Sequence, residues 1–330
     1  MRSRLSTVWR VLNPLARIIQ LQRVNAGRIE RLEQMQREVL LVLARMSLPP
    51  TELWQGRLSL REGRPEENVF PRSTLCRQDS FQSEAFSYWT RQLGQDLRYH
   101  RKLWEYVYIC QALWERGAIR PGAKGLGFGV GREPLAAYFA AQDCQIMATD
   151  ADAERGVDLG WIESAQNAAG LQTLRNSQLC PDDQFERNVA FRPCDMNHIP
   201  ADLSGFDFCW SACAFEHLGS IEHGLAFIER SVECLKPGGW SVHTTELNLS
   251  SNDRTIDKGA TVLFRRRDLE AVATRLTAKG HQVAPFDFDP GLQPMDQYLD
   301  IAPYREEPHL KVAFEGYATT SFGIIVQRAE

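Results

Sequence analysis

A glycine-rich segment and a later aspartate have the spacing of a nucleoside-binding site. Residues 125–131 read Gly-Leu-Gly-Phe-Gly-Val-Gly, and Asp150 follows Gly131 by 19 positions. Glycine is used where the backbone turns with positive φ or where a ligand passes close to the chain. A carboxylate at the end of the next strand can accept both hydroxyl groups of a ribose. Together they predict a nucleoside-containing ligand, the alternative being an ordinary strand turn and an aspartate that caps a helix.

Two histidine–glutamate pairs follow later apolar runs and could handle a proton. His217 stands beside Glu216, and Glu246 follows His243 by three positions. A neutral histidine can take a proton from a hydroxyl group near pH 7, and open α/β sheets bind ligands at the carboxyl ends of their strands. We predict His217 as a general base with Glu216, and His243 with Glu246 as the second candidate. Either histidine could instead be a hydrogen-bonded structural residue.

The sequence predicts no metal site. Its eight cysteines include no C-x-x-C pair, and the acidic residues of the C-terminal region fit no defined metal-binding loop. Cys209 and Cys213 have the first spacing of an iron–sulfur motif, but Glu216 stands at the third position. We expect the cysteines to be reduced and to have a structural role.

Short apolar runs that alternate with helical segments after Gly122 predict a parallel sheet wound with helices. We expect a Rossmann-like α/β fold, with a seven-stranded, mostly parallel sheet and helices on both faces. The predicted strands are 124–128, 144–149, 189–193, 206–212, 240–245, 282–286 and 322–327.

The chain is expected to contain an N-terminal arm, a linker and one catalytic domain. Residues 1–48 form the predicted arm, residues 49–82 are rich in Pro, Arg, Glu and Ser and read as a linker, and residues 83–330 form the domain. Its predicted parts are a helical lead-in at 83–119, a cofactor-binding core at 120–287, a lid or substrate region at 288–321, and the last strand at 322–330.

The arm is basic and has a coiled-coil-like pattern. It holds nine arginines against three glutamates, and Asn13 and Pro14 begin a predicted helix that continues to residue 47. Apolar residues recur at a/d heptad positions. Three interpretations stay open: homo-oligomerisation through this helix, peripheral contact with an anionic membrane through its arginines, or packing on its own domain.

The glycine spacing disfavours a G-x-G-x-x-G dinucleotide site, because Arg132 or Val130 stands where the last glycine belongs. Instead, residues 120–287 resemble the class I S-adenosylmethionine-dependent methyltransferases, whose first motif is acid-x-G-x-G-x-G. Gly125 occupies the position of the acid, which leaves open what holds the methionine amino group of the cofactor. The resemblance continues through the strand at 206–212, the Phe-Glu-His-Leu segment at 215–218, and Leu-Lys-Pro-Gly-Gly at 235–239.

The resemblance implies S-adenosyl-L-methionine as the cofactor. Asp150 would bind its ribose, Ala151 would lie on the adenine, and Asp195 and Met196 would contact the adenine amino group and ring. Asp195 could otherwise cap a helix. The residues implied in cofactor binding are Gly127, Phe128, Gly129, Gly131, Asp150, Ala151, Asp195, Met196 and Ser211.

The whole arrangement is similar to methyltransferases of bacterial cell-surface glycans and glycosylated metabolites, which implies polysaccharide biosynthesis and O-methylation of a sugar or glycan hydroxyl. An NAD-dependent dehydrogenase and a non-catalytic S-adenosylmethionine-binding scaffold are the alternatives. A net charge of −4 with no broad basic face argues against nucleic acid as a partner. Without a recognisable secretory signal or an 18-residue apolar run, a cytoplasmic protein is expected, with possible peripheral membrane contact through the arm.

Overall fold

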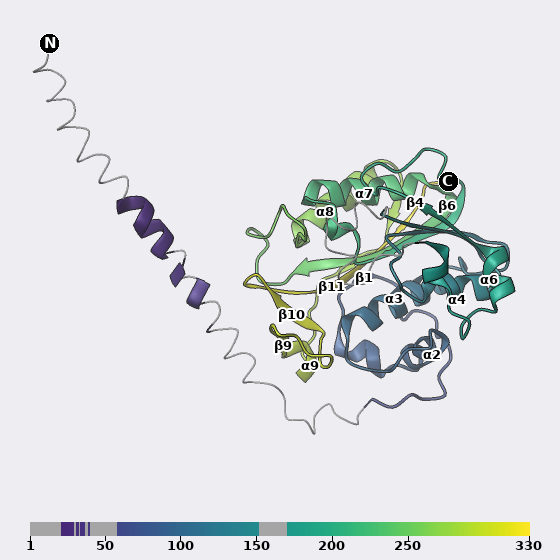
Figure 1. Cartoon of the computed structure of the whole chain (residues 1–330), viewed down its shortest axis with the longest axis horizontal. Coiled ribbons are helices and arrows are strands. Elements are labelled where there is room, and N and C mark those ends of the chain that lie inside the picture. The colour runs from purple at the N-terminus through teal and green to yellow at the C-terminus, as the bar shows by residue number, and fades with distance from the viewer. Residues whose placement is uncertain (1–20, 30, 33, 37–38, 40–57, 152–169) are drawn as a thin grey trace, which may run out of the picture. The chain divides into compact units, whose positions relative to one another are not determined.

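The computed structural model describes residues 21–29, 31–32, 34–36, 39, 58–151 and 170–330 (Figure 1). The chain divides into two units, residues 1–48 and 49–330, and each is described by itself. In the first unit the described residues are helical. The remainder of the predicted helix at 14–47 lies outside the described residues, and its pairing as a coiled coil stays a prediction. None of the helices formed by the described residues has the length and apolarity needed to cross a membrane.

The second unit is built on a mixed sheet in which most neighbouring strands are parallel. The strand order is β4-β3-β2-β5-β6-β11-β10-β9, and β7 also pairs with β11. Strands β4, β3, β2, β5 and β6 run parallel, whereas β11 is antiparallel to β6, β10 and β7. The bounds are β2 Lys124–Phe128, β3 Gln145–Asp150, β4 Val189–Pro193, β5 Phe206–Ala212, β6 Leu235–Asn248, β7 Gln282–Val283, β9 Leu299–Asp300, β10 Lys311–Phe314 and β11 Tyr317–Gln327.

The described sheet therefore has nine strands, and the prediction of seven is wrong. The predicted strand at 282–286 is divided into β7 and β8 (Phe286–Asp287), and β8 pairs with β1 (Ser73–Thr74) in a separate two-stranded sheet. Strands β9 and β10 and the start of β11 lie inside the segment 288–321 that was expected to be a lid. Part of that segment is thus the edge of the sheet, because its short strands find partners there.

Helices cover both faces of the sheet, as predicted (Figure 1). Side chains of α3 and α4 pack with Ile146, Phe208 and Trp210 on one face, and those of α7 and α8 pack with Leu126 and Cys209 on the other. The bounds are α2 Glu84–Gln92, α3 Arg101–Glu115, α4 Leu135–Ala141, α6 Asp182–Asn188, α7 Ile221–Glu233, α8 Arg266–Ala278 and α9 Pro294–Gln297, with 3-10 turns at η2 Gln78–Gln82, η3 Leu171–Leu174 and η4 Phe215–His217.

Part of the predicted linker at 49–82 packs into the domain. Phe70, Leu75 and Phe81 are buried, and the amide groups of Val69 and Phe70 donate hydrogen bonds to Glu115 of α3. The sequence did not reveal these buried residues, because three apolar side chains within twelve mostly polar residues form no periodic pattern. The linker prediction is therefore corrected for this stretch.

Two glycines of β2 make room for aromatic side chains of β5. A Cβ atom at Gly125 would lie 2.5 Å from the ring of Phe208 and 2.8 Å from Ile146. A Cβ atom at Gly127 would lie 2.5 Å from the ring of Trp210. Real Cβ atoms do not approach other atoms this closely, so both glycines are required by packing between the strands.

Candidate active site

The glycine loop and the turns after β4 and β5 meet at the carboxyl edge of the parallel strands. Gly129 and Gly131 have φ of +56° and +51°, which side-chain-bearing residues rarely adopt. A Cβ atom at Gly129 would lie 2.8 Å from the Cβ atom of Ala214 and 3.4 Å from the Sδ atom of Met196. Three segments predicted to contact the cofactor are therefore in mutual contact.

Asp150 ties the second strand to the glycine loop. Its carboxylate is 4 % exposed, and it accepts hydrogen bonds from the amide of Gly131 (3.1 Å) and from the amide of Ala151 (2.8 Å). Each carboxylate oxygen can accept a further hydrogen bond. The side chain is thus held at the loop and retains the chemistry that ribose binding requires.

Asp195 accepts hydrogen bonds from its own turn. One oxygen accepts from the amide of Asn197 (2.9 Å), and the other lies 2.8 Å from the Nδ1 atom of His198. These contacts are those of the capping alternative, in which the carboxylate bonds to groups of its own turn. The neighbouring Met196 is buried against the loop.

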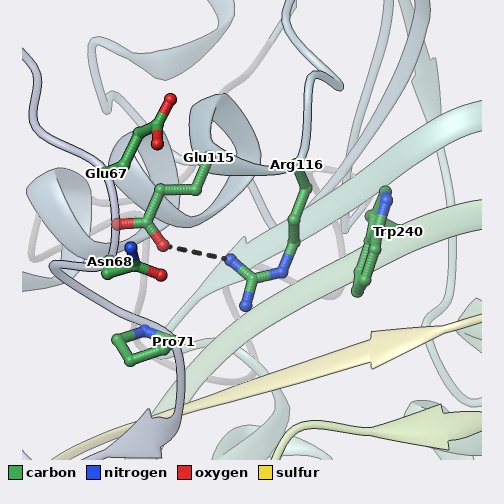
Figure 2. Close-up of a pocket in the computed structure, with 6 residues that line it drawn as sticks. All are labelled: Glu67, Asn68, Pro71, Glu115, Arg116 and Trp240. Atoms are coloured by element: carbon green, nitrogen blue, oxygen red, sulfur yellow. Dashed lines mark ion pairs between the residues drawn. The ribbon is translucent and has the colours of Figure 1, made fainter.

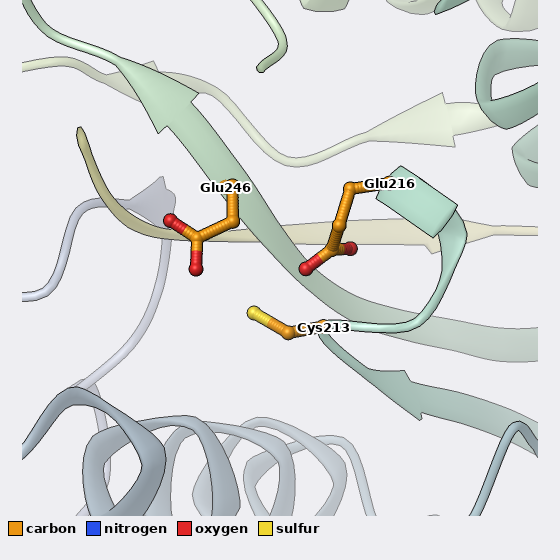
Figure 3. Close-up of side chains that lie close together, drawn as sticks. All are labelled: Cys213, Glu216 and Glu246. Carbon is orange, nitrogen blue, oxygen red and sulfur yellow. The ribbon is translucent and has the colours of Figure 1, made fainter. Parts of the chain in front are cut away.

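Three side chains converge near the carboxyl ends of β5 and β6: Cys213 and Glu216, which follow β5, and Glu246, which lies in the last part of β6 (Figure 3). Their ligand atoms lie within 4.8 Å of one another. Glu216 accepts a hydrogen bond from Thr245 (3.1 Å), and Glu246 accepts one from Thr319 (2.9 Å). The thiol of Cys213 is held neutral, because burial raises its pKa well above the ordinary value.

The N-terminal end of α3 supplies charges to the same place. Arg101 forms an ion pair with Glu246, and Lys102 pairs with Glu105 at 2.6 Å and donates to the carbonyl oxygen of Ala212 at 3.3 Å. Glu105 also accepts from Ser321 (2.6 Å). Burial alone would raise the pKa of Glu105, but Lys102 and Arg101 hold it below its ordinary value.

We refer to these six residues, Arg101, Lys102, Glu105, Cys213, Glu216 and Glu246, as the polar cluster. The members of the cluster that lie in α3 were not predicted from the sequence. The signal that could have indicated them is the presence of charged residues among the apolar positions of that helix. The cluster could hold a cation by ligand type, but two of its three carboxylates are already paired with Arg101 and Lys102.

Glu133 is another buried carboxyl group beside the glycine loop, and it too was missed. It is 7 % exposed, and among the described residues its Oε1 atom has no hydrogen-bond partner. Burial raises its pKa well above the ordinary value, against the opposing effect of Lys102. A buried carboxyl group without a hydrogen-bond partner is stabilised by taking up a proton or by binding a cation.

The structure separates the two candidate histidines. The Nδ1 atom of His217 lies 2.9 Å from the carbonyl oxygen of Ala260, so this nitrogen carries the hydrogen and donates it. His243 has no exposed surface, and serine hydroxyls contact both of its ring nitrogens. Burial lowers the pKa of His243 to about 3.

Ser211 and Phe128 also face the interior. The hydroxyl of Ser211 lies 2.8 Å from the Nδ1 atom of His243, and the ring of Phe128 packs edge-on against Phe227 of α7. Side chains alternate between the faces of a strand, and these positions fall on the side covered by α7. The structure therefore does not bring the side chains of Ser211, Phe128 and His243 to the glycine loop, contrary to the expectation from sequence.

A pocket of about 330 Å³ lies at the other end of α3, where that helix ends beside the beginning of β6 (Figure 2). It is lined by Glu67, Asn68, Pro71, Glu115, Arg116 and Trp240. The guanidinium of Arg116 lies 5.1 Å from the centre of the Trp240 ring and 3.6 Å from Glu115. None of the residues predicted to bind the cofactor or the acceptor lines this pocket.

Comparison with known proteins supports the methyltransferase assignment. Residues 125–243 match the family model described as a methyltransferase domain. No curated protein matches the chain.

Similar solved structures include magnesium protoporphyrin IX methyltransferase from Synechocystis PCC 6803 with bound S-adenosylhomocysteine (12 % identity, 76 % of this chain and 98 % of that chain, TM-score 0.43). They also include the CcbJ methyltransferase from Streptomyces caelestis (12 % identity, covering 65 % of this chain and 92 % of that chain, TM-score 0.37). TehB from Haemophilus influenzae is a third (13 % identity, covering 74 % of this chain and 67 % of that chain, TM-score 0.43). At these levels of similarity they bear on neither substrate nor mechanism.

The family match spans the glycine loop, Asp150, Asp195 and the turn that carries Glu216 and His217. The match therefore shows that residues 125–243 are similar to methyltransferase domains, in agreement with the resemblance found in the sequence.

Proposed function

We propose that this protein transfers a methyl group from S-adenosylmethionine to a hydroxyl group of a sugar or glycan. The observation that carries the proposal is the meeting of two chemically distinct sites at one edge of the sheet. The glycine loop with Asp150 suits a nucleoside, and the polar cluster suits an acceptor rich in hydroxyl groups. The glycine loop, Cys213 and Glu216 follow parallel strands, where open α/β sheets bind ligands, and the other members of the cluster come from α3 and the last part of β6.

The polar cluster has the donors and acceptors that sugar hydroxyls need. The side-chain oxygens of Glu216 and Glu246 can accept hydrogen bonds from hydroxyl groups, and Arg101 and Lys102 can donate to hydroxyl oxygens. Ion pairs within the cluster hold these side chains in place before an acceptor arrives. This preorganisation favours a small polar acceptor over an apolar one.

His217 is our candidate for the general base. It follows β5 directly, on the turn that also carries Glu216, and its hydrogen bond to Ala260 fixes the tautomer that has its lone pair on Nε2. The buried position of His243 favours His217 over it. His217 would take the acceptor's hydroxyl proton.

The residues at the carboxyl edge fit the cofactor, because the loop turns with positive φ and Asp150 is fixed beside it. When bound, S-adenosylmethionine supplies a methyl group on an activated sulfonium. The protein's main contribution would be alignment of the acceptor, which can lower a barrier by about 7–11 kcal/mol. A general base contributes about 10²–10⁴-fold.

Calorimetric titration of the full chain with S-adenosylmethionine, S-adenosylhomocysteine and NAD tests the cofactor. We expect both adenosyl ligands to bind and NAD not to bind; the reverse result would establish the dehydrogenase alternative. Transfer of a labelled methyl group to a panel of free sugars, nucleotide sugars and oligosaccharides tests the acceptor. Binding without transfer to any member would favour the non-catalytic scaffold.

We also propose that the N-terminal helix mediates self-association. The described part of this helix exposes six large apolar side chains: Leu21, Val24, Ile29, Leu32, Met35 and Val39. Light scattering on the full chain and on a variant lacking residues 1–48 should show a lower oligomeric state for the shorter chain. Equal subunit numbers, with only the full chain sedimenting on anionic vesicles, would favour membrane contact instead.

A further inference from the structure

We propose that Glu133 binds the ammonium group at the amino-acid end of the cofactor, a role that no side chain at position 125 can fill here. The inference rests on the proposed function. It answers how this chain recognises a zwitterionic ligand although its first motif lacks an acid.

Position 125 is closed to any side chain. The ring of Phe208 would lie 2.5 Å from a Cβ atom there, and that ring is fully buried. It packs edge-on against Phe139 (5.3 Å between ring centres) and stacks on Trp210 (5.9 Å), so it has no room to withdraw. A carboxylate must therefore come from elsewhere.

Glu133 is placed to supply it. The residue lies two positions beyond Gly131, and its amide donates to the carbonyl oxygen of Val130 at 3.3 Å in the turn that closes the loop. Lys102 and Glu105 from α3, and Asp150 from β3, act electrostatically on its carboxyl group, and the indole N–H of Trp210 lowers its pKa. Charged groups of both the proposed ribose site and the polar cluster therefore influence Glu133.

The charge pairing of the surrounding glutamates leaves this role to Glu133. Glu246 is paired with Arg101, Glu105 with Lys102, and Glu216 accepts a hydrogen bond from Thr245. Among the described residues, Glu105 and Glu133 each have a buried oxygen without a hydrogen bond, but that of Glu105 lies 2.6 Å from Lys102, whereas Glu133 is in no ion pair. Burying such an atom costs free energy, and a ligand ammonium would recover it as a charge-assisted hydrogen bond.

A cycle of one residue change and one ligand change tests the proposal. S-adenosylhomocysteine is compared with its deaminated analogue, in which hydrogen replaces the α-amino group, by calorimetry on the full wild-type chain and on Glu133→Gln. Loss of the amino group should weaken wild-type binding about 10–100-fold. Glu133→Gln should weaken S-adenosylhomocysteine binding by a similar factor and should bind the two ligands about equally, because the partners act as a pair.

Glu67→Gln, at an exposed glutamate of the pocket at the far end of α3, is the matched control and should leave binding unchanged. The melting temperature of ligand-free Glu133→Gln should equal or exceed that of the wild type, because the change removes a buried carboxyl group that lacks a partner. A residue with only a structural role would instead lower it.

Unchanged binding of S-adenosylhomocysteine by Glu133→Gln would overturn the inference and leave the proposed function standing. Equal binding of both ligands by the wild-type chain would do the same, and needs no variant. A wild-type chain that binds neither S-adenosylmethionine nor S-adenosylhomocysteine would overturn the proposed function itself.

Discussion

The two ends of helix α3 each carry an arginine, a glutamate and a neighbouring strand of the sheet, yet they are built differently. At the C-terminal end, Glu115 accepts hydrogen bonds from the amides of Val69 (2.7 Å) and Phe70 (3.0 Å). Arg116 there donates to the carbonyl oxygen of Ala112 (2.9 Å). At the N-terminal end, by contrast, Arg101 and Lys102 pair with the side chains of glutamates.

The difference separates a structural site from a binding site. The amide groups bonded to Glu115 belong to the backbone and cannot turn away to admit a ligand. Glu115 therefore serves to hold residues 69–70 on the helix. Side-chain pairs can be rearranged, and the N-terminal end also has the partnerless oxygen of Glu133 close by. Changes at the N-terminal end should therefore affect catalysis and binding, whereas changes at the C-terminal end should affect stability.

The largest expected effect is at His217. His217→Ala should lower kcat by about 10²–10⁴-fold, while the Kd for S-adenosylhomocysteine stays within a few-fold, because a general base acts on the rate. Steady-state kinetics with a working acceptor and calorimetry check the two quantities. His281→Ala, at the end of β11 away from the site, is the control. A rate within a few-fold of wild type would leave alignment alone to explain catalysis.

Asp150→Ala should weaken S-adenosylhomocysteine binding by about 1.5–3 kcal/mol, the free energy of a hydrogen bond to a charged group. The variant also loses the acceptor of the Gly131 and Ala151 amides, so the loop should become less ordered. Calorimetry measures the first effect, and hydrogen exchange of these amides the second. An affinity equal to wild type would remove Asp150 from the binding site.

At the opposite end, Glu115→Ala should lower the free energy of unfolding by about 1–3 kcal/mol, because it leaves two amide groups without their acceptor. Cofactor affinity should not change. Denaturant titration and calorimetry on the same preparation test both statements. If this variant bound the cofactor more weakly at unchanged stability, the division between the two ends of α3 would fail.

The smallest effect concerns His243, which is buried on the far face of the sheet. Its pKa is lowered to about 3 by burial, so folding favours the neutral ring, and the stability this contributes is present above its unfolded-state pKa of about 6.5 and is lost as the pH falls below it. Between pH 7 and pH 5.5 the loss should be about 1 kcal/mol. Denaturant titrations of wild type and His243→Gln at both pH values measure it; parallel pH dependences would contradict the assignment.

Much of the parallel sheet could be predicted from the sequence. Strands β2, β4 and β5 begin and end at the predicted residues, because each is a short run of mainly apolar or glycine residues with a turn or charged residue at its ends. Strands β9 and β10 could not be predicted, since two to four residues make no period. Their existence depends on pairing, of β10 with β11 and of β9 with β10.

The candidate site was predictable only in part. The glycine loop and Asp150 carry a local signature, and the structure places them together. Glu133, Lys102 and Glu105 carry none, because their proximity comes from packing α3 against β5 and β11. Ser211 and His243 could have been placed correctly from strand alternation alone, since Ser211 follows the buried Trp210, which faces α4.

The contact between Gly125 and Phe208 also restricts how this sequence can change. An acid introduced at position 125 would meet the Phe208 ring, so the reversion is tolerable only after residue 208 has become small. Shrinking residue 208 first would open a cavity in the core, a change that typically costs about 3–5 kcal/mol for a buried phenylalanine. Each change made alone would therefore disturb the packing between β2 and β5, whereas an acid placed after the loop leaves that packing intact.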